Sequence, residues 1–298
     1  MRLLVVTARF PTPDRPVAGA FVARRLAGVD AVIVAPERYD RPGWRRYLAM
    51  AWRALTVRGP FDGVEAHFVL PSGPIALLAA RLRGLPLVVY AHGGDVREMA
   101  DRHAAYRFAA RRVLRGADAV VTNSEDSAAH VRTLGAEAEV VPPGVELDRF
   151  RPMPRPAQRR VLYLGGSTTG KGYEVGRALA DTILGPGLEM VGHDEMPALL
   201  TAHDVVLVPS HGEGFGLVAA EAIAAGRWVV ARDVGGLHEV IDDGVNGTLV
   251  RDGDFAAAIA AVPDYDPMLL AATANRFGIE QHRAAMATIW DRVLAARR

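Results

Sequence analysis

A single lysine, Lys171, stands among the 35 basic residues of this 298-residue chain, and all the others are arginine. It lies in the glycine-rich stretch VLYLGGSTTGKGYEV, residues 161–175, just after a predicted strand. A lysine ammonium is a compact point charge on a flexible stem, which suits a phosphate oxygen in a tight loop. The stretch therefore predicts an anion-binding turn; the alternative is an ordinary lysine on a surface loop.

Two glutamates form a second candidate site in SHGEGFGLVAAEAIAAG, residues 210–226. Glu213 and Glu221 are eight residues apart, a span of about 12 Å along a helix axis. Carboxylates at this separation can accept hydrogen bonds from hydroxyls at opposite ends of an elongated ligand, such as a sugar, a diphosphate and a ribose in series. Between them lie glycines that permit close backbone approach and amides of a phosphate-binding helix N-terminus: Gly214, Phe215, Gly216 and Leu217.

Three further patterns favour ordinary structure over chemistry. The stretch GGSTTGKG, residues 165–172, ends in Gly172 where a P-loop has the Ser or Thr that holds magnesium. The acid pairs at 252–254 and 264–266 lie in late loops, where turn formation explains them better than metal binding. The histidines are too dispersed for a metal site, since His92, His193 and His211 share no ligand spacing. The sequence predicts no metal site and no cofactor.

The composition is that of an ordinary soluble globular chain, with half of its residues apolar and a net charge of +1. The absence of cysteine excludes disulfides, thiolate metal sites and cysteine nucleophiles. The N-terminal apolar run is too short for a secretory signal, and arginines interrupt the best candidate for a membrane span, so we expect a cytoplasmic protein.

Charge is distributed unevenly between the two halves of the chain. Residues 1–152 carry 22 basic and 16 acidic side chains, whereas residues 153–298 carry 13 and 18. The basic first half suits an anionic partner such as a lipid phosphate or a membrane surface. Scattered solubilising arginines explain it equally well.

Apolar runs alternate with helical patterns along the chain, which predicts parallel sheets with helices on both faces. The expected strands are residues 2–8, 30–37, 63–68, 86–93, 118–124, 138–144, 160–165, 188–192, 204–210, 227–234 and 247–250. A proline-rich linker separates the two halves. We expect an α/β fold of two Rossmann-like, doubly wound domains, with ligand sites at the carboxyl ends of the strands. Their bounds are 1–152 and 153–279, and a closing helix, 280–298, can return to the first domain.

The segment PGWRRYLAMAWRALTVRGP, residues 42–60, has aromatic and aliphatic residues at helical spacing with arginines beside them. This is typical of an interfacial helix in contact with an anionic membrane. A helix that packs its aromatics on the domain and leaves its arginines in water fits the pattern equally well.

The two-glutamate pattern of residues 210–226 resembles that of the retaining glycosyltransferases of the GT-B fold, family 4 (glycosyl transferases group 1). Four other landmarks of this family follow in order along nearly the whole chain. They are YAHGGDV at 90–96, which resembles its His-Gly-x-Asp turn, VTNSE at 121–125, VVPPGVELDRF at 140–150 and GGLHEVIDDGVNGTLV at 235–250. The family implies two domains that face a cleft.

The resemblance also implies a role for each matching residue. Glu221 would bind the donor ribose, Glu213 the hydroxyls of the donor sugar and Lys171 the leaving diphosphate. His92 would contact the sugar near the reacting carbon. The other residues that would line the donor are Gly19, Gly165, Gly166, Ser167, Gly214, Phe215, Gly216 and Leu217. The acceptor would attack on the face that the diphosphate leaves, with retention, so no protein nucleophile would be required. Electrostatic stabilisation of the diphosphate would carry most of the catalysis.

Two departures from the family pattern bear on activity. Ser167 or a neighbour occupies the place of an arginine that usually accompanies the lysine, which should weaken phosphate binding unless another arginine such as Arg232 substitutes. The stretch between Lys171 and residues 204–210 is also short by roughly 30 residues, about one strand–helix unit. The C-terminal domain is therefore expected to be shortened and its nucleobase pocket incomplete.

The expected function is transfer of a hexosyl unit from a UDP- or GDP-sugar to a hydroxyl acceptor, either lipid-linked or saccharide, in the bacterial envelope. The expected location is the cytoplasm or the inner face of the cell membrane, and nucleic acid is not an expected partner. Two alternatives stay open: a sugar-nucleotide epimerase of the same architecture, and a non-catalytic partner that retains the nucleotide site. The product distinguishes them: glycosylated acceptor, epimerised donor or neither.

Overall fold

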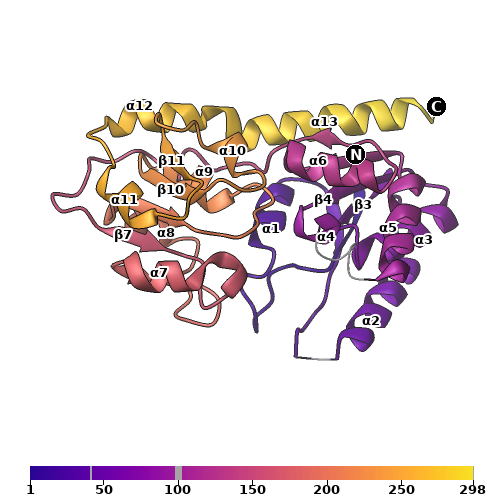
Figure 1. Cartoon of the computed structure of the whole chain (residues 1–298). Coiled ribbons are helices and arrows are strands. Elements are labelled where there is room, and N and C mark those ends of the chain that lie inside the picture. The colour runs from indigo at the N-terminus through magenta and orange to yellow at the C-terminus, as the bar shows by residue number, and fades with distance from the viewer. Residues whose placement is uncertain (41, 98–102, 298) are drawn as a thin grey trace. The chain divides into compact units, whose positions relative to one another are not determined.

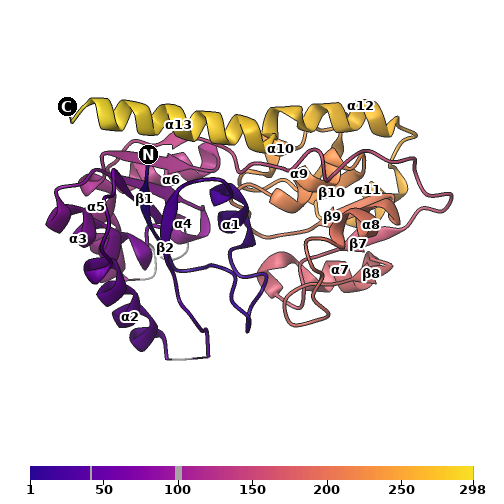
Figure 2. The same cartoon turned by 180° about the vertical axis from the view of Figure 1, so that it is seen from behind.

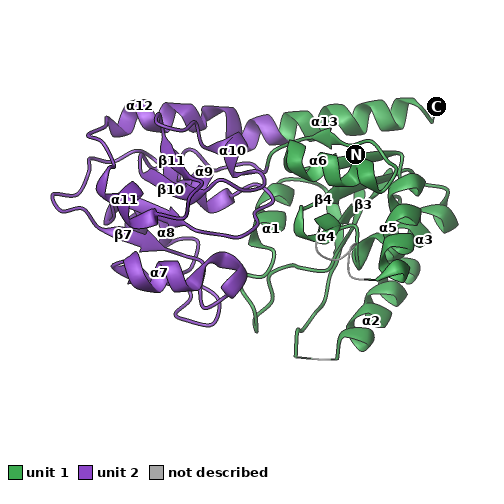
Figure 3. Ribbon diagram, viewed as in Figure 1, with its two compact units in different colours: residues 1–142, 283–298 green, residues 143–282 purple. Residues whose placement is uncertain are grey.

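Two parallel sheets form from the apolar runs, each within its own compact unit of the chain. The computed structural model describes residues 1–40, 42–97 and 103–297. Unit 1 comprises residues 1–142 and 283–298, and unit 2 comprises residues 143–282 (Figure 3). The sequence-based boundary lies after residue 152. Residues 143–152 belong to unit 2 because Val145 and Phe150 are part of its buried core.

Unit 1 contains a six-stranded parallel sheet in the order β2-β1-β3-β4-β5-β6 (Figures 1 and 2). The strands are β1 Leu3–Thr7, β2 Ala31–Val34, β3 Gly63–His67, β4 Leu87–Ala91, β5 Ala119–Thr122 and β6 Glu139–Val140. The helices are α1 Ala20–Leu26, α2 Gly43–Thr56, α3 Ser72–Arg83, α4 Gly94–Arg97, α5 Ala104–Gly116 and α6 Glu125–Thr133, together with the part of α13 (Ile279–Ala295) from Arg283 onward.

Alternate residues of β1 point to opposite faces of this sheet, as the period of a strand requires. Leu4 and Val6 join the core beneath α2, α3, α5 and α6. Leu3 and Val5 join a second core with α1 and α13. The sheet is thus buried on both faces, which accounts for its nearly continuous apolar strands.

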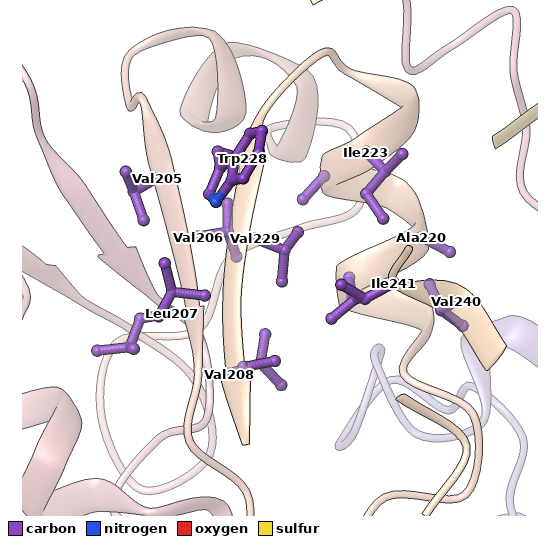
Figure 4. Packing of buried hydrophobic residues seen from close by; sticks show 14 of the residues in the cluster. Val205, Val206, Leu207, Val208, Ala220, Ile223, Trp228, Val229, Val240 and Ile241 are labelled. Carbon is purple, nitrogen blue, oxygen red and sulfur yellow. The ribbon is translucent and has the colours of Figure 1, made fainter. Parts of the chain in front are cut away.

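Unit 2 contains a five-stranded parallel sheet in the order β11-β10-β9-β7-β8. The strands are β7 Val161–Tyr163, β8 Thr182–Ile183, β9 Val205–Val208, β10 Trp228–Arg232 and β11 Gly247–Val250. The helices are α7 Tyr173–Leu179, α8 Met196–Thr201, α9 Leu217–Ala224, α10 Leu237–Val240, α11 Phe255–Ala260 and α12 Pro267–Ala272, with 3-10 turns at Thr169–Lys171 and Thr273–Phe277. Its core packs β9 and β10 against α9 and the end of α10 (Figure 4).

The strand predicted at 188–192 is wrong. That segment is irregular, and its apolar residues Leu188 and Met190 are exposed. The strand next to β7 is instead β8, with only two residues. Glycines at positive φ, Gly185 and Gly187, end it early, so the sheet of unit 2 has a short edge strand.

The helix expected in residues 42–60 forms as α2. The alternative in which this helix packs its aromatic side chains on the domain is wrong. Met50 and Ala54 are buried against the sheet, whereas Trp44 and Trp52 are exposed. Among the described residues, no helix has both the length and the apolar character required to cross a membrane.

Candidate functional site

The glycine-rich turn after β7 is held by the hydroxyl of Tyr163. This hydroxyl donates to the carbonyls of Gly166 (3.1 Å) and Lys171 (3.2 Å), so it ties both ends of the turn to the strand. Gly166 has a φ of 64°, a conformation that side chains with a Cβ rarely adopt. A Cβ on Gly165 would collide with the ring of Tyr163. The local structure therefore requires glycine at both positions. The turn places Ser167 at its exposed tip.

Lys171 and Glu213 meet from two different loops. The ammonium Nζ donates to Glu213 Oε2 at 2.7 Å, and Ser210 Oγ donates to the same oxygen at 3.3 Å. Strands β7 and β9, which precede these loops, are parallel neighbours, so both loops leave the same edge of the sheet. The lysine side chain is 42% exposed and the glutamate 19%. The two residues predicted to face the diphosphate and the sugar thus lie side by side in unit 2.

The turn into α9 is shaped by glycines. Gly216 has a φ of 96° and immediately precedes the helix. A Cβ on Gly236 would collide with the carbonyl of Gly214, so the glycine pair at 235–236 packs directly on this turn. Phe215 is buried edge-on against Phe277, with ring centroids 5.3 Å apart. The phosphate-binding amides predicted at Phe215, Gly216 and Leu217 are therefore those of a rigid turn at the start of the helix.

Glu221 lies inside α9 and is buried. The sequence did not predict a cluster of charged side chains from residues 146–149 and from the loop before α8. His193 Nε2 and Glu146 Oε2 are 2.7 Å apart. The pKa of Arg149 is raised by its hydrogen bond to Asp194 and further by the negative charges of Glu146 and Glu221. Arg149 therefore lies within electrostatic range of Glu221.

Arg232, the predicted substitute for the missing arginine, has other partners. Its Nε donates to the carbonyl of Pro209 at 3.4 Å, and its guanidinium lies 5.1 Å from the centre of the Phe255 ring. Pro209 contacts Gly172 closely enough to forbid a Cβ there. Arg232 thus supports the backbone behind the glycine-rich turn.

In unit 1, His92 follows β4 in a turn organised by Asp95. The carboxylate of Asp95 accepts the backbone N–H of Val69 (2.6 Å) and of His92 (2.8 Å). The side chain of Asn123 donates to the carbonyl of His92 at 3.2 Å, from the end of the neighbouring strand β5. The predicted landmarks at 90–96 and 121–125 are thus joined through the backbone of His92.

Burial raises the pKa of Asp95 from 3.8 to about 6, although the N–H groups of Val69 and His92 partly offset it. Between these two values the folded protein binds more protons than the unfolded chain. The protonated carboxyl therefore stabilises the fold fully below the unfolded pKa, and this contribution is lost as the pH rises through the folded pKa.

We expect the wild type to gain up to about 3 kcal/mol of unfolding free energy relative to Asp95→Asn as the pH falls from about 7 to about 4. Urea unfolding of both proteins across this range measures the difference. A difference that stays constant with pH would contradict the assigned titration.

His92 also contacts a buried polar chain that sequence reasoning missed. His67 Nδ1 and His92 Nε2 are 2.9 Å apart, and His67 Nε2 lies 2.9 Å from Glu65 Oε1. Glu65 is paired with Arg25 and accepts the indole N–H of Trp290 at 2.9 Å. Burial lowers the pKa of His67, which keeps it neutral. The sequence feature that could have indicated this chain is the presence of two titratable residues inside the apolar strand 63–68.

Two other residues of unit 1 bear on this region. Phe68, beside His92 with ring centroids 4.5 Å apart, has a φ of 73°, and such backbone strain is concentrated at functional sites. Gly19 has a φ of 65°, and a Cβ there would collide with the carbonyl of Arg9. The packing of the loop alone thus accounts for the glycine at 19, and a role toward phosphate is a separate prediction.

The second aspartate of each late acid pair caps a helix. Asp254 accepts the N–H of Ala257 at the start of α11, and Asp266 accepts that of Met268 at the start of α12. Within residues 1–40, 42–97 and 103–297, no group of three or more His, Asp or Glu side chains is arranged to hold a metal ion.

Two models of known protein families together match most of the chain. The model of the glycosyl transferase 4-like domain matches residues 1–144, and that of glycosyl transferases group 1 matches residues 150–263. The D-inositol 3-phosphate glycosyltransferase of Geodermatophilus obscurus is 34% identical over 79% of this chain. That of Saccharomonospora viridis is 28% identical over 95% of this chain and 78% of its own length. The chain spans 65% of the length of the first relative and 59% of that of a 32% identical Mycobacterium tuberculosis protein with the same name.

Solved structures show the same fold at low sequence identity. Anabaena HepE in complex with UDP has a TM-score of 0.71 and 17% identity, and the match covers 98% of this chain and all of that one. Sucrose-phosphate synthase from Thermosynechococcus elongatus has a TM-score of 0.74 and 18% identity, over 99% of both chains.

Proposed function

The chain belongs to the GT-B glycosyltransferases of family 4 (glycosyl transferases group 1), and from this membership we propose that it transfers a hexosyl unit from a UDP- or GDP-sugar to a hydroxyl acceptor. The anomeric configuration of the donor is retained. The observation that carries the proposal is the Lys171–Glu213 pair, one residue from each of two loops at the carboxyl ends of adjacent strands. Structures similar in fold were solved with UDP and with UDP-glucose, which supports a nucleotide-sugar donor.

In this mechanism each residue acts on the donor by charge or hydrogen bonding. Lys171 neutralises the diphosphate as the bond to the sugar breaks, and Glu213 accepts hydrogen bonds from the sugar hydroxyls. Glu221 binds the ribose hydroxyls, and His92 contacts the sugar near the reacting carbon. The acceptor hydroxyl forms the new glycosidic bond on the face from which the diphosphate leaves, as the bond from the sugar to the diphosphate breaks. Its proton passes to the departing phosphate oxygen, so no protein nucleophile is required. Because Lys171 and the loop amides supply the positive charge, transfer is expected to proceed with chelator present.

The acceptor in this proposal is a lipid-linked or saccharide hydroxyl of envelope biosynthesis, met at the inner face of the cell membrane through residues 42–60. The names of the relatives make an inositol phosphate the first soluble acceptor to assay. One competing function has support of its own: a non-catalytic nucleotide-sugar-binding partner. Ser167 in place of the family arginine and the short edge strand β8 favour it.

Thermal unfolding with UDP, GDP and ADP, and with Mg-ATP as a control ligand, tests the donor site. A nucleotide that binds only the folded protein, at 100 times its dissociation constant, adds about 2.7 kcal/mol. We expect this shift with UDP or GDP in the wild type and its loss in Glu221→Ala. The matched control is Glu174→Ala, an exposed carboxylate on α7, which should keep the shift. Stabilisation by Mg-ATP alone, or by no nucleotide, would overturn the donor assignment.

A further inference from the structure

Three helices of unit 1 form a continuous layer with a uniform charge. α3 packs between α2 and α5, and the three lie side by side over one face of the sheet (Figures 1 and 2). Their sequences, 43–56, 72–83 and 104–116, contain nine arginines and no aspartate or glutamate. The arginines whose side chains are exposed are Arg45, Arg81, Arg107, Arg111, Arg112 and Arg115.

The same layer exposes large apolar side chains. Trp44, Trp52 and Phe108 are 62%, 71% and 71% exposed. The others are Leu48 on α2, Leu78 and Leu82 on α3, and Tyr106 on α5. Soluble proteins rarely gather so many large apolar groups on one surface unless the surface binds a partner.

The combination of aromatic and arginine side chains identifies the partner. Tryptophan is enriched at the boundary between lipid and water, and arginine extends its charged end toward phosphate while its stem covers apolar surface. On α2 the two kinds of side chain are adjacent: the guanidinium of Arg45 lies 5.1 Å from the centre of the Trp44 ring. Helices whose charged side chains are all arginine are complementary to an anionic surface, and Arg53 near the end of α2 is the one paired with an acid outside them, Glu37 at 3.2 Å, among the ion pairs of the described residues.

We propose that the outer surface of α2, α3 and α5, hereafter the acid-free face, binds an anionic phospholipid bilayer, with Trp44, Leu48 and Trp52 entering the interface. The surface extends the membrane contact beyond residues 42–60 to two helices that are separate in sequence. All of its residues belong to unit 1, so the proposal holds whether or not unit 2 binds a nucleotide sugar.

Co-sedimentation with vesicles tests the acid-free face. At low salt the wild type should bind vesicles of phosphatidylglycerol and phosphatidylcholine, and bind pure phosphatidylcholine at least about tenfold more weakly, because the basic side chains add attraction to anionic lipid. Trp44→Ala/Trp52→Ala should lower affinity for the anionic vesicles by about tenfold or more. Arg111→Gln/Arg112→Gln should lower it by about fivefold per charge.

The matched control is Met268→Ala/Leu269→Ala, which removes two exposed apolar side chains from α12 in unit 2. It should bind the anionic vesicles as the wild type does. Intrinsic fluorescence supplies a second readout, since the other two tryptophans, Trp228 and Trp290, are buried. Anionic vesicles should shift the emission of the wild type to shorter wavelength. They should not shift that of Trp44→Ala/Trp52→Ala, whose buried tryptophans report that it is folded.

Three results would overturn the proposal. The first is no binding of the wild type to anionic vesicles at low salt. The second is an equal loss of binding in Trp44→Ala/Trp52→Ala and in the control Met268→Ala/Leu269→Ala. The third is lipid-free dimerisation, seen by analytical ultracentrifugation, that disappears in Trp44→Ala/Trp52→Ala; the acid-free face would then bind a second copy of the chain.

Discussion

Replacing Lys171 with methionine is expected to lower kcat/KM for sugar transfer by about 10²–10³-fold, the usual effect of removing one group that stabilises charge in a transition state. The lysine Nζ lies 2.7 Å from Glu213 and belongs to a loop with little freedom, because Tyr163 ties both of its ends. In the proposed mechanism, removal of this ammonium leaves the backbone amides at the start of α9 to face the departing diphosphate. Steady-state transfer rates with the donor that stabilises the protein measure the effect.

Two variants make this experiment specific. Arg177→Met removes an exposed cation on α7, paired with Glu174, and should leave kcat/KM nearly unchanged. Lys171→Arg keeps the charge but replaces the compact ammonium by a planar fork, so its activity should lie between that of the wild type and Lys171→Met. If Lys171→Met retained wild-type kcat/KM, the assignment of Lys171 to the diphosphate would be wrong.

Glu65→Ala is expected to lower the free energy of unfolding by about 3–5 kcal/mol, because it leaves the buried charge of Arg25 uncompensated. The side chain of Glu65 is fully buried and accepts hydrogen bonds from Arg25 and Trp290. Burial alone would raise the pKa of Glu65, but Arg25 and His67 more than offset it and hold the pKa well below its usual range. The contribution is therefore present above the unfolded pKa and is lost as the pH falls through the folded one.

Urea unfolding near neutral pH measures this loss. The matched control is Glu174→Ala, which breaks an exposed ion pair and should cost about 0–1 kcal/mol. The double variant Arg25→Met/Glu65→Met removes both charges and should be less destabilised than Glu65→Ala. A loss below about 1 kcal/mol for Glu65→Ala would contradict the view that this buried pair organises the environment of His67 and His92.

The sequence predicts the strands best where burial alone decides them. The runs at 204–210 and 227–234 are apolar because β9 and β10 are covered on both faces, and such runs are visible without a structure. At 188–192 a similar run is exposed, since the glycines of the preceding loop end β8 after two residues. Local hydrophobicity cannot distinguish these cases, because burial depends on what packs above the segment.

The candidate site also contains features that the sequence predicts and features that it does not. The closeness of Lys171 and Glu213 follows from the rule that loops after parallel neighbouring strands share one edge, although the order of strands within the sheet had to be assumed. The chain of Arg25, Glu65, His67 and Trp290 joins α1, β3 and α13. Glu65 and Trp290, which are hydrogen-bonded, are 225 residues apart, and the only local sign of the chain is a pair of titratable residues inside the apolar strand 63–68. The partners of Glu65 and His67 can be recognised only after the fold brings Arg25 and Trp290 to them.

The most direct test of the proposed transfer is ¹H NMR of the anomeric signals of UDP-glucose and GDP-mannose incubated with the wild type and an inositol phosphate or a saccharide acceptor. We predict that a new anomeric signal grows with the same configuration as the donor, in step with release of UDP or GDP, and that Lys171→Met slows it strongly. An inverted linkage, an epimerised donor, or a nucleotide sugar that binds and is never consumed would contradict the account.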